Sequence, residues 1–269
     1  MSALDTAAAP VAGTRRTTAP QGIPMHRVVS TELRKSFDTR SGFWLMVSIA
    51  VLATVATAAV VVFAPDSQQT YNSFAGAVGV PMTIILPIIA ILSVTGEWSQ
   101  RTGLTTFTLV PRRGRVIAAK AIVSVGIGVV SIALAAAIGA VGNVVGSALA
   151  GVPTTWDLPV TTLLDIVLAN VLGLLIGFML GVLLRSSAAA IVAYFVYSFV
   201  LPTLSGLLAG SQEWFHRLQP WVDFNFAQGV LYNGSMTAQA WAHLAVTATI
   251  WVLVPLLVGV RLVMRSEVK

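Results

Sequence analysis

The segment Gly96–Lys120 reads GEWSQRTGLTTFTLVPRRGRVIAAK and is a polar, basic island between two long apolar stretches. It contains five of the sixteen Lys and Arg residues of the chain. Charged side chains are costly in hydrocarbon, so such a segment separates two membrane spans. Basic loops between spans are retained in the cytoplasm. The segment therefore predicts a polytopic membrane protein and also the side of the membrane on which this loop lies.

The composition of the whole chain predicts an all-α membrane protein. Hydrophobic residues make up 56% of the 269 residues and charged residues only 10%, whereas soluble domains carry about 25% charged residues. The chain has no cysteine, which excludes disulfides and thiolate metal sites. The net charge is +6, but the basic residues flank apolar spans, where lipid and topology account for them. We therefore expect membrane lipid, and no nucleic acid, among the partners.

Working outward from the basic loop, six apolar segments are long enough to cross the membrane as helices. The first, Phe43–Phe63, has 21 residues without a charge, about 31 Å of helix. The predicted spans are 43–63, 74–94, 121–149, 161–184, 188–208 and 242–260. With the N-terminus inside, 15 of the 16 Lys and Arg residues fall on the inner side. The count predicts that both termini are cytoplasmic.

The two segments that flank the first and last spans have their own patterns. Residues 1–24 lack a long apolar run and are expected to form a disordered cytoplasmic tail. Met25, Val28, Val29, Leu33 and Phe37 share one helical face, which predicts either an amphipathic helix on the membrane surface or an extension of the first span. Residues 210–241 are too polar to cross and too apolar for a free loop, which predicts a broken or re-entrant segment on the outer side.

The fourth predicted span carries the polar residues of interest. Gly173, Gly177 and Gly181 recur every four residues, a spacing typical of close helix packing. Asp165 and Asn170 do not share a face of this helix. Either they line an outer vestibule completed by other helices, or Asp165 solvates the helix end and Asn170 hydrogen-bonds a neighbouring helix.

One local motif in the loop resembles a known family. An acidic residue is followed by a Thr-rich segment, a Pro-Arg turn and a Lys that opens the third span: Glu97, Arg101-Thr102-Gly103, Thr105-Thr106, Leu109, Pro111-Arg112-Arg113 and Lys120. Together with the topology, this motif resembles the membrane (permease) subunit of bacterial ABC transporters of the type-2 exporter class. The resemblance covers about residues 25–269, a six-helix permease domain. Leu104 departs from it, since many relatives have Thr there.

The resemblance implies that the loop 96–120 couples the membrane domain to a separate ATPase. In this family the loop after the second span forms a coupling helix that fits a cleft in the ATPase subunit. The residues so assigned are Glu97, Arg101, Gly103, Leu104, Thr105, Phe107, Leu109, Arg112 and Arg113. The residues alone leave two alternatives, a docking segment or a basic loop that only fixes topology. The apolar Leu104 and Phe107 favour docking.

The same resemblance also implies partners and cofactors. The chain has no G-x-x-x-x-G-K-[ST] phosphate loop, so we expect ATP and Mg²⁺ on a separate ABC ATPase subunit and no cofactor in this chain. Six spans are half the usual complement, which implies a dimer with a second copy or a related permease. His26, His216 and His243 belong to no catalytic motif, so we expect no catalytic or metal residues.

Two functions therefore remain open. The first is the permease subunit of an ATP-driven exporter in the bacterial plasma (inner) membrane, an efflux protein that moves a hydrophobic or amphipathic substrate. The alternative is a membrane scaffold or sensor that holds a cytoplasmic partner on the same loop without transport. An intramembrane enzyme is a weaker third idea, because the spans hold no constellation of catalytic groups.

Overall fold

The computed structural model describes residues 23–38, 40–99 and 113–265. Within these ranges the chain is helical and contains no strand, only an isolated bridge between Thr70 and Thr155. The predicted all-α fold is therefore confirmed. Most of the predicted tail 1–24 lies outside the described residues.

Six helical segments of the described chain are long and apolar enough to cross a membrane, as predicted. They are Gly42–Phe63, Tyr71–Gly96, Gly114–Ala150, Val160–Leu184, Ser187–Ser211 and Ala238–Arg265. The third and sixth extend well beyond the predicted edges, because their first or last turns are polar and hydropathy alone marks only the apolar part of a helix.

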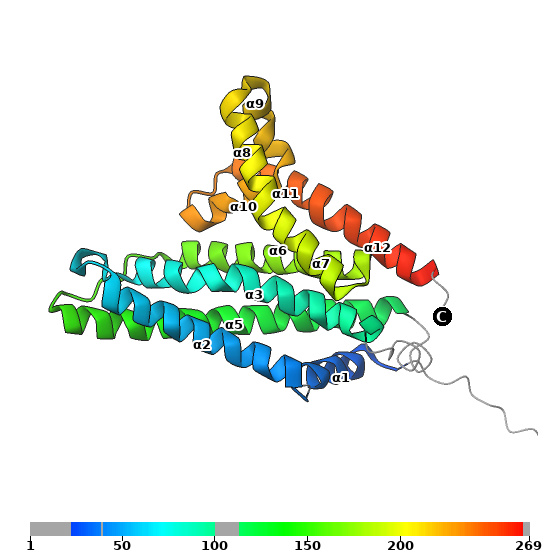
Figure 1. Ribbon diagram of the computed structural model, residues 1–269, viewed down its shortest axis with the longest axis horizontal. Coiled ribbons are helices and arrows are strands. Elements are labelled where there is room, and N and C mark those ends of the chain that lie inside the picture. Colours follow the sequence, from blue (N-terminus) through cyan, green and yellow to red (C-terminus); the bar gives the residue numbers. More distant parts are fainter. Residues whose placement is uncertain (1–22, 39, 100–112, 266–269) are drawn as a thin grey trace, which may run out of the picture.

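The first four spans lie alongside one another in a four-helix layer (Figure 1). They are α2 (Arg40–Phe63), α3 (Tyr71–Ser99), α5 (Arg113–Ala150) and α6 (Val160–Leu184), and the short helix η1 (Asp66–Gln68) joins α2 to α3. Their shared core is apolar and fully buried, with Ile49, Met82, Leu86, Leu174 and Phe178 among its members. Helices α3 and α5 are the central elements, since each packs on the other three helices of this group.

The last two spans cross this layer and rise away from it (Figure 1). The fifth is α7 (Ser187–Phe195), the π-helical turn η2 (Val196–Val200) and α8 (Leu201–Ser211). The sixth is α11 (Ala238–Ala248), the π-helical turn η4 (Thr249–Leu253) and α12 (Val254–Arg265). A second apolar cluster joins them to α6, and its buried members include Ile176, Tyr194, Leu244 and Val252.

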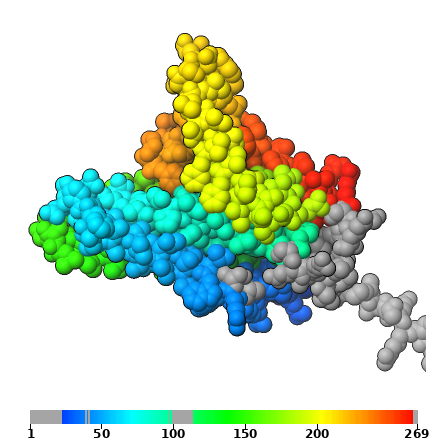
Figure 2. All heavy atoms as spheres, in the orientation of Figure 1, coloured from blue at the N-terminus to red at the C-terminus, as the bar shows by residue number. Residues whose placement is uncertain are grey.

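The segment before the sixth span is broken into short helices, as predicted: α9 (Glu213–Val222), α10 (Phe224–Gly229) and η3 (Val230–Asn233). Two side chains fasten it to the spans. Gln228 Nε2 donates to the carbonyl oxygen of Ala169 on α6 at 2.6 Å, and Trp251 Nε1 of η4 donates to that of Val222 at 2.7 Å. Helices α8 and α9 form a hairpin that projects from the body of the molecule (Figure 2).

The N-terminal helix α1 (Met25–Asp38) lies at one end of the four-helix layer (Figure 1). The C-terminal end of α3, the beginning of α5 and the end of α12 lie at the same end. The connections around Asp66 and Asp157 lie at the opposite end, where the amide of Tyr71 donates to the carbonyl oxygen of Thr155. The described chain therefore starts and finishes on one side of the layer.

Candidate functional site: a buried ion pair at the base of the basic loop

The side of α1 that faces protein differs from the apolar face read from the sequence. Of the five residues on that face, only Val28 is buried, while Leu33 and Phe37 are 43% and 49% exposed. The second buried residue of α1 is Glu32, at 5% exposure. Thus α1 presents a carboxylate to the helix layer and keeps much of its apolar face outside, available to lipid.

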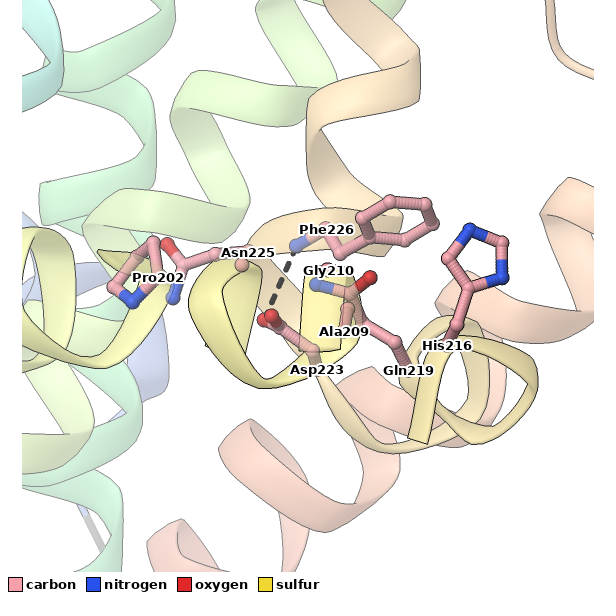
Figure 3. Close-up of a pocket in the computed structure, with 9 residues that line it drawn as sticks. Pro202, Ala209, Gly210, His216, Gln219, Asp223, Asn225 and Phe226 are labelled. Carbon is pink, nitrogen blue, oxygen red and sulfur yellow. Dashed lines mark hydrogen bonds between the residues drawn. The ribbon is translucent and has the colours of Figure 1, made fainter. Parts of the chain in front are cut away.

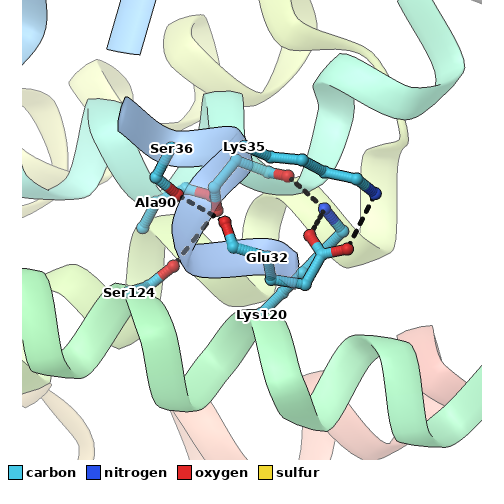
Figure 4. A network of polar contacts seen from close by, with 7 residues as sticks. Glu32, Lys35, Ser36, Ala90, Lys120 and Ser124 are labelled. Atoms are coloured by element: carbon cyan, nitrogen blue, oxygen red, sulfur yellow. Dashed lines mark hydrogen bonds and ion pairs between the residues drawn. The ribbon is translucent and has the colours of Figure 1, made fainter. Parts of the chain in front are cut away.

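Glu32 is the centre of a polar network that joins three helices (Figure 4). Lys120 Nζ on α5 donates to Glu32 Oε2 at 2.6 Å and to the carbonyl oxygen of Ser93 on α3 at 3.0 Å. Lys35 Nζ donates to the other carboxylate oxygen, Oε1, at 2.8 Å. The hydroxyls of Ser93 and Ser124 lie 3.1 Å apart and link α3 to α5 beside the pair. The ammonium group of Lys120 therefore fastens α5 to α1 through Glu32 and to α3 through Ser93.

The network keeps Glu32 ionised. Burial by itself raises the pKa of Glu32, but the charge of Lys120 and hydrogen bonds from Lys120 and Lys35 together outweigh it, and the pKa lies below its ordinary value. The Glu32 and Lys120 side chains are only 6% and 8% exposed. A buried pair of this kind costs desolvation to form, and loss of one member leaves an uncompensated charge. Because a displacement of α1 would separate the two buried charges, the pair holds α1 in a fixed position relative to α5.

Two of the nine residues assigned to coupling lie in the described helices, and the other seven do not. Arg101, Gly103, Leu104, Thr105, Phe107, Leu109 and Arg112 belong to 100–112, outside the described residues. The backbones of Glu97 and Arg113 are helical, at the end of α3 and the start of α5, and their side chains lie outside the description. The structure thus places the two ends of the segment together, one to three turns from the buried pair.

Sequence reasoning missed the role of Glu32, although it singled out Lys120 as the residue that opens the third span. Two signals could have found the pair. Lys120 is followed by a long apolar stretch, where an ammonium group requires a partner. Glu32 lies one turn after Val28, on the side of α1 that faces the layer.

The glycine face of α6 lies where helices meet closely. A Cβ atom at Gly177 would come within 2.5 Å of the carbonyl oxygen of Pro87 on α3, and one at Gly181 within 3.3 Å of that of Ile91. Gly173 faces the side chain of Gln228 at 3.5 Å instead. Two of the three predicted packing glycines therefore lie against α3, and the third lies under the broken segment.

The two polar residues of α6 do not form a joint site. Asn170 is buried, and its Nδ2 donates to the carbonyl oxygen of Ile166 in its own helix at 2.9 Å, not to a neighbouring helix. Its Oδ1 is buried and has no hydrogen-bond partner in the described part of the chain. Asp165 is partly buried. Among the described residues, no group of three or more His, Cys, Asp or Glu side chains is arranged to hold a metal ion.

Comparison with models of protein families and with curated proteins found no match to this chain.

Proposed function

We propose that this chain is the permease subunit of an ATP-driven exporter of the type-2 ABC class. In this proposal a separate ATPase docks on the loop 96–120 and supplies the energy to move a hydrophobic or amphipathic substrate. Six apolar helices and the motif from Glu97 to Lys120 support it. ATP and Mg²⁺ belong to the partner, and a second copy or a related permease completes the pathway.

The observation that carries the proposal is the fastening of α1, α3 and α5 where the basic loop leaves and re-enters the helix layer. Glu32 and Ser93 both bind the ammonium group of Lys120. A force applied to the loop would therefore move the three helix ends together. A basic loop that only fixes topology has no need for such a rigid base.

The length of α5 extends this argument across the molecule. Its 38 residues correspond to about 57 Å of helix, more than the hydrocarbon thickness of about 30 Å. A displacement at its first turn would be carried as a rigid body to the opposite end, where Asn143 Nδ2 on the same helix donates to the carbonyl oxygen of Thr155 at 2.9 Å. This gives ATPase motion a mechanical route through the membrane.

The test compares two Phe→Ala variants of the full chain. Phe107→Ala removes the proposed apolar knob of the loop, and truncation of a residue at an interface centre costs about 2 kcal/mol or more in binding. Phe63→Ala makes the same change at the end of α2, where the ring is 84% exposed at the opposite end of the layer. We expect Phe107→Ala alone to weaken co-purification of an ATPase or to uncouple hydrolysis from transport.

Arg113→Ala provides a second comparison, because exposed charge pairs contribute only about 0–1 kcal/mol. Its effect should be milder than that of Phe107→Ala and should depend more on salt. Full ATPase binding and full transport by Phe107→Ala would contradict the proposal. Retention of a partner that does not hydrolyse ATP would favour the scaffold or sensor instead.

A further inference from the structure

A cavity of about 430 Å³ lies between α8, α9 and the beginning of α10 (Figure 3). We call it the hairpin pocket. Its lining includes Gly206 and Gly210 of α8, His216 and Gln219 of α9, Asp223, which precedes α10, and Phe226 of α10. Its volume is in the range of pockets that hold small molecules. The pocket shares no residue with the ion-pair network at the other end of the spans.

The α8–α9 hairpin exposes several large apolar side chains and buries one polar side chain. Leu204, Leu207 and Trp214 are 55%, 67% and 57% exposed. Gln219, in contrast, is buried and donates from Nε2 to Ser205 Oγ at 3.1 Å. Large apolar side chains with this degree of exposure are expected where lipid surrounds part of the hairpin.

The charge of the hairpin pocket is negative. Asp223 contributes a carboxylate, and no Lys or Arg lines the pocket. One carboxylate oxygen, Oδ1, accepts from the amide of Phe226 at 3.1 Å, and no Lys or Arg of the described residues forms an ion pair with Asp223. A carboxylate in a lipid-facing hairpin without a basic partner is complementary to a cationic ligand.

The segment that forms much of the pocket, 212–237, carries two acidic residues and one basic residue. The basic one, Arg217, lies 3.7 Å from Glu213 and is therefore already paired. The remaining charge of the segment is that of Asp223, which attracts cations and repels anions.

The pocket also offers an apolar surface to the ligand. Phe226 is 46% exposed, and a ring face attracts a cation electrostatically, most strongly where water is excluded. On the α8 side, Gly206 and Gly210 leave room, because a Cβ atom at either position would meet no other atom within 4 Å. The lining therefore suits a ligand that has both a positive charge and an apolar body.

We propose that the hairpin pocket binds a lipophilic cation, a quaternary ammonium or phosphonium with apolar substituents. Its charge is held by Asp223 and its body lies against Phe226 and the glycine face of α8. This binding requires neither an ATPase nor transport. The binding proposal can therefore be wrong while the proposed function is right, and the proposed function can be wrong while the binding proposal is right.

The experiment measures binding of radiolabelled tetraphenylphosphonium to the purified full chain in phosphatidylcholine nanodiscs, counted above empty nanodiscs. Tetraphenylborate has nearly the same shape and the opposite charge. We expect saturable binding of the cation and none of the anion. Asp223→Asn retains an oxygen that can accept from the Phe226 amide and loses only the charge, so it should bind the cation about tenfold more weakly or worse.

Two further variants make the result specific. Glu213→Gln removes the same charge from the same hairpin outside the pocket and should bind as the wild type does. Gly210→Leu fills the pocket without a change of charge and should abolish binding even if Asp223→Asn does not fold. Equal binding of tetraphenylborate, equal loss in Glu213→Gln and Asp223→Asn, or wild-type binding by Gly210→Leu would each overturn the proposal.

Discussion

Lys120 lies at the point where α5 becomes apolar, and its ammonium group is held by Glu32 Oε2 and the carbonyl oxygen of Ser93. Its side chain is 8% exposed, so water cannot replace a lost partner without opening the helix contact. Loss of the Glu32 carboxylate would leave the Lys120 ammonium group buried without its main counter-charge, which is strongly destabilising.

Glu32→Gln is accordingly expected to lower the free energy of unfolding by about 3 kcal/mol. Thermal unfolding of the purified protein in a single detergent measures the change. Glu213→Gln is the matched control, because Glu213 is 85% exposed and its pair with Arg217 is long, a geometry that contributes about 0–1 kcal/mol. Equal melting temperatures for the two variants would contradict a structural role for the buried pair.

The pH dependence separates charge from packing in the same experiment. The pKa of Glu32 is lowered in the folded protein, so its contribution is complete above the ordinary Glu pKa of about 4.3 and is lost as the pH falls through the lower folded value. The gap in stability between wild type and Glu32→Gln should therefore stay constant at neutral pH and close below about pH 4. A gap that persists in acid would assign the effect to shape alone.

Single residues show how far the sequence could be read. The motif identified Lys120, because a Lys at the start of an apolar span is unusual. Nothing comparable identified Glu32, because its neighbours on α1 are basic and its partner lies 88 residues away in the sequence. Pairing across that distance is a property of the fold, and the local signals at Lys120 and Glu32 show that each needs a partner without identifying it.

At the scale of elements, the contact between α6 and α3 depends on the absence of side chains. Gly177→Ala is expected to destabilise the protein by about 1–3 kcal/mol, since its Cβ atom would come within 2.5 Å of the Pro87 carbonyl oxygen. Both helices would have to shift to admit it. The melting temperature in detergent reports the loss.

Gly126→Ala is the control for this change. Gly126 lies inside α5, and a Cβ atom there would meet no other atom within 4 Å. The same substitution should leave stability unchanged or raise it by up to about 1 kcal/mol through helix propensity. If the two alanines behaved alike, close packing at Gly177 would be refuted.

The existence of the helices was predictable, but the lengths of the third and sixth spans were not, and helix facing was only partly predictable. The apolar composition of a segment is enough to identify a membrane span. The spacing of four residues from Gly173 to Gly181 indicated a packing face. On α1, however, the apolar periodicity of Leu33 and Phe37 indicated a face toward lipid, while the contact with protein is made through Val28 and Glu32. Periodicity identifies an apolar face but not the neighbour that it meets.

At the scale of the whole molecule, the described chain begins and ends on one side of the helix layer (Figure 1). Because the chain has no cysteine, single cysteines can report which side that is. We expect Ser235→Cys to be labelled from outside intact cells by a membrane-impermeant thiol reagent, and Thr106→Cys to be protected. The basic count that motivates this expectation places Gly210–Trp241 outside.

Labelling of Thr106→Cys in intact cells with protection of Ser235→Cys would invert the topology. If both cysteine variants were labelled only after lysis, position 235 would lie inside the cell, which would equally contradict the expected topology. Wild-type protein, which has no thiol, supplies the background.

The crossing of the last two spans over the four-helix layer had no counterpart in the sequence. In a membrane an apolar side chain can face lipid or another helix with similar energy, so hydropathy does not reveal which helices pair. The contacts that set this arrangement are the apolar cluster shared with α6, which includes Ile176 and Leu244, and polar contacts such as that of Trp251 with the carbonyl oxygen of Val222. The position of the hairpin pocket follows from that arrangement and could not be predicted either.

The separation of Glu32 from Lys120 also imposes an order on biosynthesis. Lys120 follows Glu32 by 88 positions, which take roughly 4 to 18 s to synthesise at about 5–20 residues per second. Throughout that interval α1 is complete but its partner does not yet exist. A lone carboxylate remains in water rather than enter an apolar layer, so α1 waits at the surface while α2 and α3 insert. Docking of the first helix therefore has to wait until the beginning of α5 has been synthesised.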